Sequence, residues 1–168
     1  MLYRHVPEKL PFRGIIEPLA VLFKDEVRRL GLELGMPYKM VYRQPFPGPG
    51  LAVRIVGEIT KEKIRMVQEA NAILDEVVSK YQYEDKMSQY FVALTNMKSV
   101  GVMGDIRTYN YAAAIRVVKT SDFMTANYVQ LPYDLIDEVS RRIVNEVKGI
   151  NRVFYDVTSK PPATIEYE

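Results

Sequence analysis

The chain has 168 residues, of which 48% are hydrophobic and 26% are charged, and its formal net charge is +2. This length is enough for one domain and part of another, and the near-neutral charge predicts no strong attraction to nucleic acid or anionic lipid. The chain has no cysteine and one histidine, His5, which excludes disulfides, thiol nucleophiles and sites with several histidines. No apolar run approaches a membrane span, so we expect a soluble, cytoplasmic protein with no membrane partner.

The first quarter of the chain predicts one amphipathic helix. Residues 1–14 contain two prolines and are expected to be irregular. Residues 15–37 then carry apolar side chains at helical spacing, and Gly35 and Pro37 are typical of a helix end. These apolar residues are Leu19, Leu22, Phe23, Val27, Leu30 and Leu34. No strand pattern accompanies this helix, so we interpret residues 1–43 as the end of a separate domain.

A proline- and glycine-rich segment follows at residues 44–50. Pro45, Pro47 and Pro49 fix φ and lack an N–H donor, which excludes a regular helix or a central strand. Gly48 and Gly50 permit turns that other residues resist. The segment is therefore predicted to be a stiff hinge.

Residues 51–168 predict an α+β domain of order β-α-β-β-β-α-β. Strand patterns occupy residues 51–59, 89–95, 98–104, 108–120 and 151–158, and residues 121–130 are expected to form a loop. One helix starts after the capping residue Thr60 and the other after Pro132. Two helices with one apolar stripe each can cover one face of a mostly antiparallel sheet, which gives a two-layer sandwich. We expect Ala113, Ile115 and Val117 on the other, helix-free face, where they would require a partner.

Four segments carry unusual residue combinations: RQPFPGPGLAVR at 43–54, KSVGVMGDIRTY at 98–109, TSDFMT at 120–125 and TSKPPATIEYE at 158–168. Together they closely resemble the C-terminal region of the glutamine-hydrolysing GMP synthetases, and the resemblance extends from about Ile16 to the C-terminus. It implies that residues 1–43 are the end of an α/β ATP pyrophosphatase domain. It also implies that residues 51–168 form a homodimer and bind the nucleotide substrate, xanthosine monophosphate (XMP).

The resemblance implies a ligase reaction. In that family ATP and Mg²⁺ activate the C2 oxygen of XMP, and ammonia from glutamine then displaces AMP to give GMP. This chain contains neither the Ser-Gly-Gly-x-Asp-Ser phosphate loop of the ATP domain nor the cysteine of the glutamine domain. We therefore expect no catalytic residue, metal ligand or ATP site in this chain alone, and we expect the ATP pyrophosphatase and glutamine amidotransferase domains or subunits as partners.

Residues near the C-terminus are the first candidates for XMP binding. Lys160 offers three donors to a phosphate, and the prolines after it stiffen the backbone. Glu166 can accept hydrogen bonds from a ribose or from purine N–H groups. The simpler alternative is a loose, charged terminus. The resemblance favours a ligand clamp that includes Lys160, Ile165 and Glu166.

Four further candidates come from the sheet region. Asp105 and Arg107 follow Gly104 in a predicted turn, and the resemblance places both near the nucleotide, with Arg107 as an anion partner. A turn cap and a solvated arginine are the alternatives. Arg152 is a second candidate cation, with a surface salt bridge as its alternative. Gln89 is unremarkable alone, but the resemblance implies that it reads the purine.

Two other function classes have some support in the sequence. Residues 101–104 spell GxxG, as in KH-type nucleic-acid-binding modules, but a KH loop joins helices among basic residues, whereas here Asp105 follows. We therefore expect no nucleic-acid partner. A dimerisation module without a ligand is the third class, and a tail that stays disordered in the presence of XMP would favour it.

Overall fold

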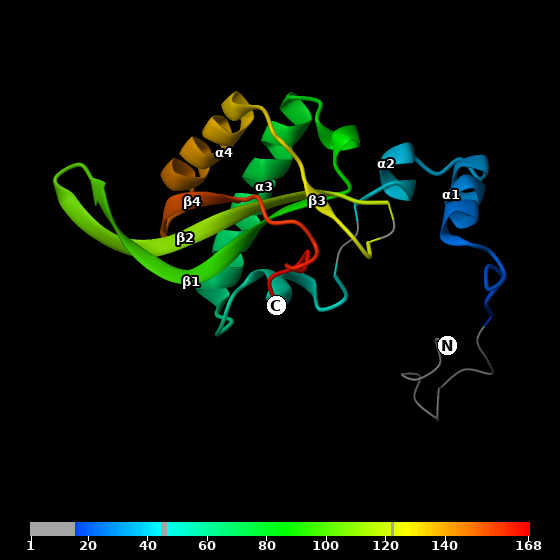
Figure 1. Ribbon diagram of the computed structural model, residues 1–168, viewed down its shortest axis with the longest axis horizontal. Helices are drawn as coiled ribbons and strands as arrows, with labels where there is room; N and C mark the ends of the chain where they lie inside the picture. Colours follow the sequence, from blue (N-terminus) through cyan, green and yellow to red (C-terminus); the bar gives the residue numbers. More distant parts are fainter. Residues whose placement is uncertain (1–15, 45–46, 122) are drawn as a thin grey trace. The chain divides into compact units, whose positions relative to one another are not determined.

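The computed structural model describes residues 16–44, 47–121 and 123–168, and the chain divides into two compact units, Met1–Arg43 and Gln44–Glu168 (Figure 1). The expectations for residues 1–14 and for Pro45 lie outside the described residues. Each unit is considered by itself below. None of the described helices is long and apolar enough to cross a membrane.

The described part of the first unit contains α1 (Lys24–Glu33) and the short α2 (Tyr38–Val41). The helix is shorter than predicted, because residues up to 22 form turns and α1 begins only after Phe23. The backbone N–H of Phe23 donates to the Glu26 carboxylate at 2.8 Å, which satisfies a group that the first turn leaves free. Gly35, with φ +78°, follows the helix as expected.

The second unit is built on a four-stranded sheet with β2 (Ile106–Lys119) at its centre. Strand β1 (Gln89–Met103) pairs antiparallel with one edge of β2. Along the other edge lie the two-residue β3 (Asn127–Tyr128), which is antiparallel, and β4 (Ile150–Asp156), which is parallel. The sheet is therefore mostly antiparallel, as predicted.

Two long helices contribute the main core. Helix α3 (Lys61–Lys80) begins where Thr60 Oγ1 accepts the Lys63 N–H at 3.2 Å, and α4 (Tyr133–Glu146) begins after Pro132. Their apolar stripes pack on one sheet face with Val92, Leu94, Ala113, Ile115 and Val117. This confirms the predicted two-layer α+β architecture.

Three predicted strands differ in detail from the structure. Residues 51–59 form the 3-10 helix η2 (Gly50–Arg54) and then a single parallel bridge from Ile55 to Leu94. Gly50 and Gly57, with φ of +73° and +81°, bend the backbone at both ends of this segment, so the alternating pattern never extends into a strand. The segments at 89–95 and 98–104 are one strand, β1, with a register irregularity between Leu94 and Lys98. Strand β3 lies inside the predicted loop, and its two residues are too few to show a pattern.

The second face of the sheet corrects a further expectation. Ala113, Ile115 and Val117 are fully buried, but they face the helices, so they do not form a helix-free apolar surface. The opposite face carries Ala112, Ala114, Arg116 and Val118, all buried. Alternation along β2 separated the two sets correctly, but it could not say which set the helices would cover.

The C-terminal tail, together with residues 123–126, covers part of this second face. Ile165 and Ala126 form a small apolar cluster with Phe91, Ala93 and Val118, and the Tyr167 ring meets the Phe91 ring edge-on at 6.4 Å between centroids. The β1–β2 hairpin continues beyond the helices, and in Figure 1 its tip projects past α4 and β4.

Candidate functional site

The tail is held by backbone hydrogen bonds at both of its ends. Lys160 and Ala126 exchange two of them, at 2.7 and 2.9 Å, and form an isolated antiparallel bridge. Further along, the N–H groups of Tyr167 and Glu168 donate to the Val53 carbonyl at 3.3 and 3.1 Å. The tail is therefore not a loose terminus, and its side chains are presented from a defined backbone.

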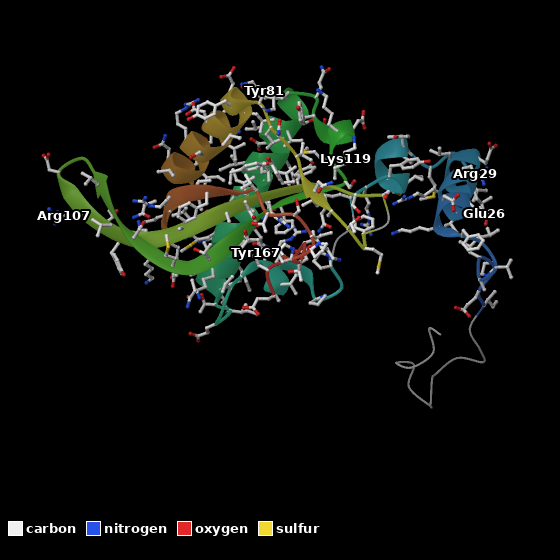
Figure 2. The ribbon with its side chains drawn as sticks, in the orientation of Figure 1. Glu26, Arg29, Tyr81, Arg107, Lys119 and Tyr167 are labelled. Carbon is white, nitrogen blue, oxygen red and sulfur yellow. The ribbon has the colours of Figure 1, made fainter. Side chains whose placement is uncertain are left out.

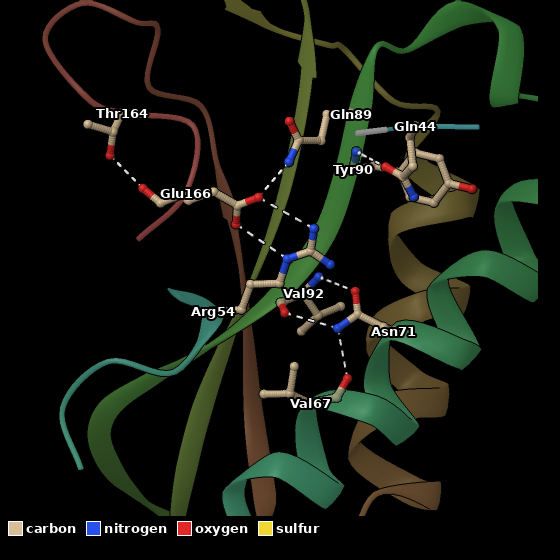
Figure 3. A network of polar contacts seen from close by, with 9 residues as sticks. All are labelled: Gln44, Arg54, Val67, Asn71, Gln89, Tyr90, Val92, Thr164 and Glu166. Atoms are coloured by element: carbon tan, nitrogen blue, oxygen red, sulfur yellow. Dashed lines mark hydrogen bonds and ion pairs between the residues drawn. The ribbon is translucent and has the colours of Figure 1, made fainter. Parts of the chain in front are cut away.

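Glu166 is the centre of a polar network on this tail (Figure 3). Its carboxylate accepts a hydrogen bond from the Gln89 side-chain amide at 2.6 Å and two from the Arg54 guanidinium at 3.3 and 3.4 Å. Residues from the tail, from the start of β1 and from η2 thus meet at one point. The side chains of Arg54 and Glu166 are 5% and 19% exposed, so solvent screens their attraction only weakly.

Arg54 was not among the predicted site residues. The guanidinium carbon lies 4.4 Å from the centroid of the Phe91 ring, which orients the charged group toward Glu166. The sequence signal was a single charge inside the apolar run LAVRIV. Read as a strand, that charge would face solvent, whereas the 3-10 turn directs it inward.

Side-chain amides fix the outer edge of β1 beside this network (Figure 3). The Gln44 side-chain oxygen accepts the Tyr90 N–H at 2.9 Å, and the Asn71 side-chain oxygen accepts the Val92 N–H at 3.0 Å. The Asn71 amide also donates to the Val92 carbonyl at 3.1 Å. These contacts satisfy edge groups that would otherwise be free to pair with another strand, and they hold Gln89 in place.

Lys160 lies half-buried at the other end of the tail. Its ammonium group donates to the Phe123 carbonyl at 2.7 Å, so one of its three donors binds the 123–126 loop. A polar depression of about 290 Å³ adjoins this loop and is lined by Lys119, Thr120, Ser121, Thr125, Ala126 and Asn127. Lys160 is therefore a fixed cation that joins two loops.

The structure brings together Gln89, Ile165 and Glu166, with Lys160 on the same tail. Ile165 is the buried member, because it packs in the apolar cluster and directs its neighbour Glu166 toward Arg54. Sequence reasoning placed these residues in one site because of a resemblance. The structure joins Gln89 to Glu166 directly, and the role of these residues in binding XMP stays a prediction.

Asp105 and Arg107 lie elsewhere, at the tip of the hairpin. Figure 2 shows Arg107 at this tip, well separated from Tyr167 of the tail. Strand β1 has 15 residues, so at about 3.3 Å per residue the tip lies roughly 40–50 Å from Gln89. Both side chains are exposed. Within one chain these two residues cannot contact a nucleotide held at Gln89.

Arg152 is also separate from the Glu166 network. Its Nε donates to the Ser99 hydroxyl at 3.1 Å, across the sheet from β4 to β1. The GxxG run belongs to the same hairpin, with Gly101 in β1 and Gly104, at φ +60°, in the turn. Because the run joins strands and no helix adjoins it, the geometry argues against a KH-type loop.

Asp156 contributes a charge below the tail. Burial acts to raise the pKa of its carboxyl group, but hydrogen bonds from Thr158 and from the Tyr167 hydroxyl, together with the charge of Arg116, hold that pKa below the ordinary value. The Tyr167 hydroxyl lies 2.9 Å from the carboxylate, and the Thr158 N–H lies 2.9 Å from its other oxygen. Asp156 is therefore an anion at neutral pH.

The described residues contain no group of three or more histidine, cysteine, aspartate or glutamate side chains that could hold a metal ion. Because Mg²⁺ is usually held by one or two carboxylates together with substrate phosphates and waters, this absence assigns no residue to the Mg²⁺ that the resemblance implies. What the described ranges do offer is a polar network in which the Glu166 carboxylate of the ordered tail meets a guanidinium from η2 and an amide from β1. Convergent polar groups of this kind are typical of small-molecule binding sites.

Comparison with known proteins identifies the family of this chain. The family model described as "GMP synthase C terminal domain" matches residues 75–167. The chain is 61% identical over 163 residues to a GMP synthase [glutamine-hydrolyzing] of Clostridium botulinum (strain Eklund 17B / Type B), covering 97% of this chain and 32% of the relative. The corresponding protein of Treponema denticola is 59% identical over 163 residues, covering 97% and 31%.

The structure defines the chain's larger unit as a two-layer α+β domain. The chain belongs to the GMP synthase C-terminal domain family. It spans about a third of the length of the curated relatives it matches.

Proposed function

We propose that this chain is the dimerising, XMP-binding part of a glutamine-hydrolysing GMP synthase. In this proposal the complete enzyme, a cytoplasmic ligase, converts XMP to GMP with ATP, Mg²⁺ and glutamine-derived ammonia. The single observation that carries the proposal is the convergence of Gln89, Arg54 and Glu166 at the end of an ordered tail. The relatives' names supply the class of reaction.

The network contains the groups that a purine nucleotide requires. A carboxylate has about four acceptor positions, and the contacts from Arg54 and Gln89 leave room for a purine N–H or a ribose hydroxyl on Glu166. The Gln89 amide carries both donor and acceptor atoms, which suits the edge of an oxidised purine base. Lys160 supplies a cation for the phosphate group on the same tail.

We infer that residues 1–43 are the end of an ATP pyrophosphatase domain, that residues 44–50 are a hinge, and that residues 51–168 are the dimerising domain. ATP and Mg²⁺ then bind outside this chain, and the remaining catalytic groups belong to the ATP pyrophosphatase and glutamine amidotransferase domains or subunits. The purified chain alone should accordingly release no pyrophosphate from ATP when XMP is added. Release above the background of a heat-denatured sample would contradict this assignment.

We infer that the dimer contact lies on the β1–β2 hairpin, because the sheet face that carries Ala113, Ile115 and Val117 is covered by helices. The hairpin exposes four large apolar side chains, each between 57% and 71% exposed: Val100, Val102, Ile106 and Tyr109. Exposed apolar side chains on a projecting hairpin are typical of a protein–protein contact. Asp105 and Arg107 share this hairpin, so they can meet a nucleotide at Gln89 only if a second copy supplies them. Light scattering of the parent chain and of Val102→Asp tests this, because a dimer should become a monomer.

The direct test is titration calorimetry of XMP into the purified chain, with IMP as the matched control. IMP lacks the C2 oxygen but keeps the ribose and phosphate. The proposal expects saturable binding of XMP and weaker binding of IMP. Absence of XMP binding, both to the chain alone and to the chain combined with an ATP-domain partner, would contradict it.

A further inference from the structure

Arg116 is the most deeply buried charged group in the described part of the chain. It lies on β2 on the face opposite the helices, and its residue exposure is 0%. Arginine is almost never fully buried without partners, because leaving water costs a charged group its solvation. The burial of Arg116 is therefore explained by the groups that its guanidinium binds.

All the polar partners of Arg116 lie in the final strand and the tail. Its two terminal nitrogens donate to the Thr158 carbonyl and, at 2.9 Å, to the Thr164 carbonyl. The first of these nitrogens also lies 3.3 Å from the Asp156 carboxylate, which balances the charge. Within the described ranges the Arg116 Nε has no hydrogen-bond partner. The contacts of the guanidinium with the tail therefore leave one buried donor unsatisfied.

The two carbonyl groups mark the ends of one loop. Residues 159–163 lie between them and include Lys160, and Glu166 follows two residues after Thr164. The planar guanidinium has a rigid fork of donors, so it fixes the separation of the two carbonyls as well as binding each of them. Asp156 extends the same network, because it accepts the Tyr167 hydroxyl at 2.9 Å.

We propose that Arg116 is a positioning residue for nucleotide binding: it closes the loop at residues 158–164 and so sets Lys160 and Glu166 in their binding positions. This inference rests on the proposed function. Arg116 itself touches no ligand, because its side chain is fully enclosed. Small neighbours make this arrangement feasible, since Ala112 and Ala114 on the same face of β2 leave space for the long side chain.

The competing explanation is that Arg116 is only a part of the core. Hydrogen exchange separates the two, and this measurement needs no ligand. Arg116→Met keeps a long side chain without donors. We expect the amide of Lys160 and those of Tyr167 and Glu168 to exchange at least about tenfold faster in this variant, with the amides of Ile115 and Val117 unchanged. Equal loss of protection in the tail and in the strands would overturn the proposal.

Measurements of XMP binding test whether the position that Arg116 gives to the tail matters for nucleotide affinity. Displacing Lys160 and Glu166 weakens their charge-assisted hydrogen bonds to the nucleotide, so Arg116→Met should weaken XMP binding roughly ten- to a hundredfold. Arg65→Met, which alters an exposed arginine on α3, is the matched control and should bind as the parent does. Arg116→Lys keeps the charge but offers one nitrogen for two carbonyls, so it should restore only part of the affinity.

A double variant shows whether Arg116 acts through Lys160. If it does, adding Arg116→Met to Lys160→Ala should weaken binding far less than Arg116→Met weakens the parent. Fully additive losses would overturn the proposal. If Arg116→Met does not fold, Arg116→Lys is measured in the same way, and parent-like tail exchange with parent-like affinity would overturn the proposal. If the parent chain binds no XMP, the proposed function fails, while the exchange experiment still tests the role of Arg116 in the tail.

Discussion

The two faces of the sheet are stabilised by different means. The face under α3 and α4 is closed by a continuous apolar core that contains Leu74, Leu135 and Ile143, each fully buried. The opposite face has a cluster of only five buried apolar residues, and beside it lie Arg116 and the Glu166 network. Apolar packing has no required direction, whereas hydrogen bonds to charged groups require fixed geometry.

This difference assigns different tasks to the two faces. The helix-covered face provides the free energy that keeps the domain folded, because buried apolar area is the largest favourable contribution. The tail-covered face has less apolar area to lose, and it presents carboxylate, amide and cationic groups in defined positions. Substitutions on the first face should therefore unfold the domain, and substitutions on the second should change the order of the tail and the XMP binding proposed for it.

The largest effect is expected from Leu74→Ala, which empties a fully buried position on the helix-covered face. Removal of a buried leucine side chain typically lowers the free energy of unfolding by about 2.7–5 kcal/mol. Urea denaturation followed by circular dichroism measures this. Ser79→Ala, at an exposed position on the same helix, is the control and should change stability by less than about 0.5 kcal/mol.

Lys160→Ala should come next, through affinity more than through stability. A hydrogen bond to a charged group contributes about 1.5–3 kcal/mol, so XMP binding in the assembled enzyme should weaken roughly ten- to a hundredfold. The dimer should persist, although the loop at Phe123 loses a contact. Lys160→Arg should restore part of the affinity, and Glu166→Gln should impair recognition of the base or ribose more than that of the phosphate.

Lys61→Ala removes an exposed lysine from the start of α3 and serves as the matched control for calorimetry with XMP. Unchanged affinity in Lys160→Ala would show that the tail does not clamp the nucleotide.

Ile165→Ala sharpens the comparison, because it removes apolar contact from the tail-covered face. Ile165 is only 8% exposed, so the tail contributes to the small apolar cluster on this face. We expect a loss of about 1–2 kcal/mol, below the usual range for a central isoleucine, because this cluster is small. Hydrogen exchange should show faster exchange of the Tyr167 and Glu168 amides, which donate to the Val53 carbonyl, while amides of the helix-covered core stay protected. Global unfolding at the scale of Leu74→Ala would remove the distinction between the faces.

The smallest effect concerns pH. The folded-state pKa of Asp156 lies below its ordinary value, so its contribution to stability is present above about pH 4 and is lost as the pH falls through the folded-state pKa. Asp156→Asn should lower the free energy of unfolding by about 1 kcal/mol at pH 6, with the difference shrinking toward pH 3. Urea denaturation across this range measures it, with the exposed Asp137→Asn as control. A difference independent of pH would mean that the charge is not what matters.

The sequence by itself determined the elements that local physics specifies. Thr60 and Pro132 predicted the starts of two helices. The apolar stripes of these helices predicted a two-layer sandwich with both helices on one face of the sheet. Alternation along β2 separated two faces, and long unusual motifs indicated the family and the tail as a site. These features depend on spacing and backbone geometry, which the sequence contains directly.

Only the tertiary structure decided which groups meet. It turned residues 50–54 into a 3-10 helix so that Arg54 reaches Glu166, and it placed Arg116 under the tail where a charged strand residue would be expected to face solvent. It also separated Asp105 and Arg107 from Gln89 by the length of a strand. The reason is that a charge is buried or exposed according to what a distant segment places beside it, and Glu166 lies 112 residues from Arg54 in the chain.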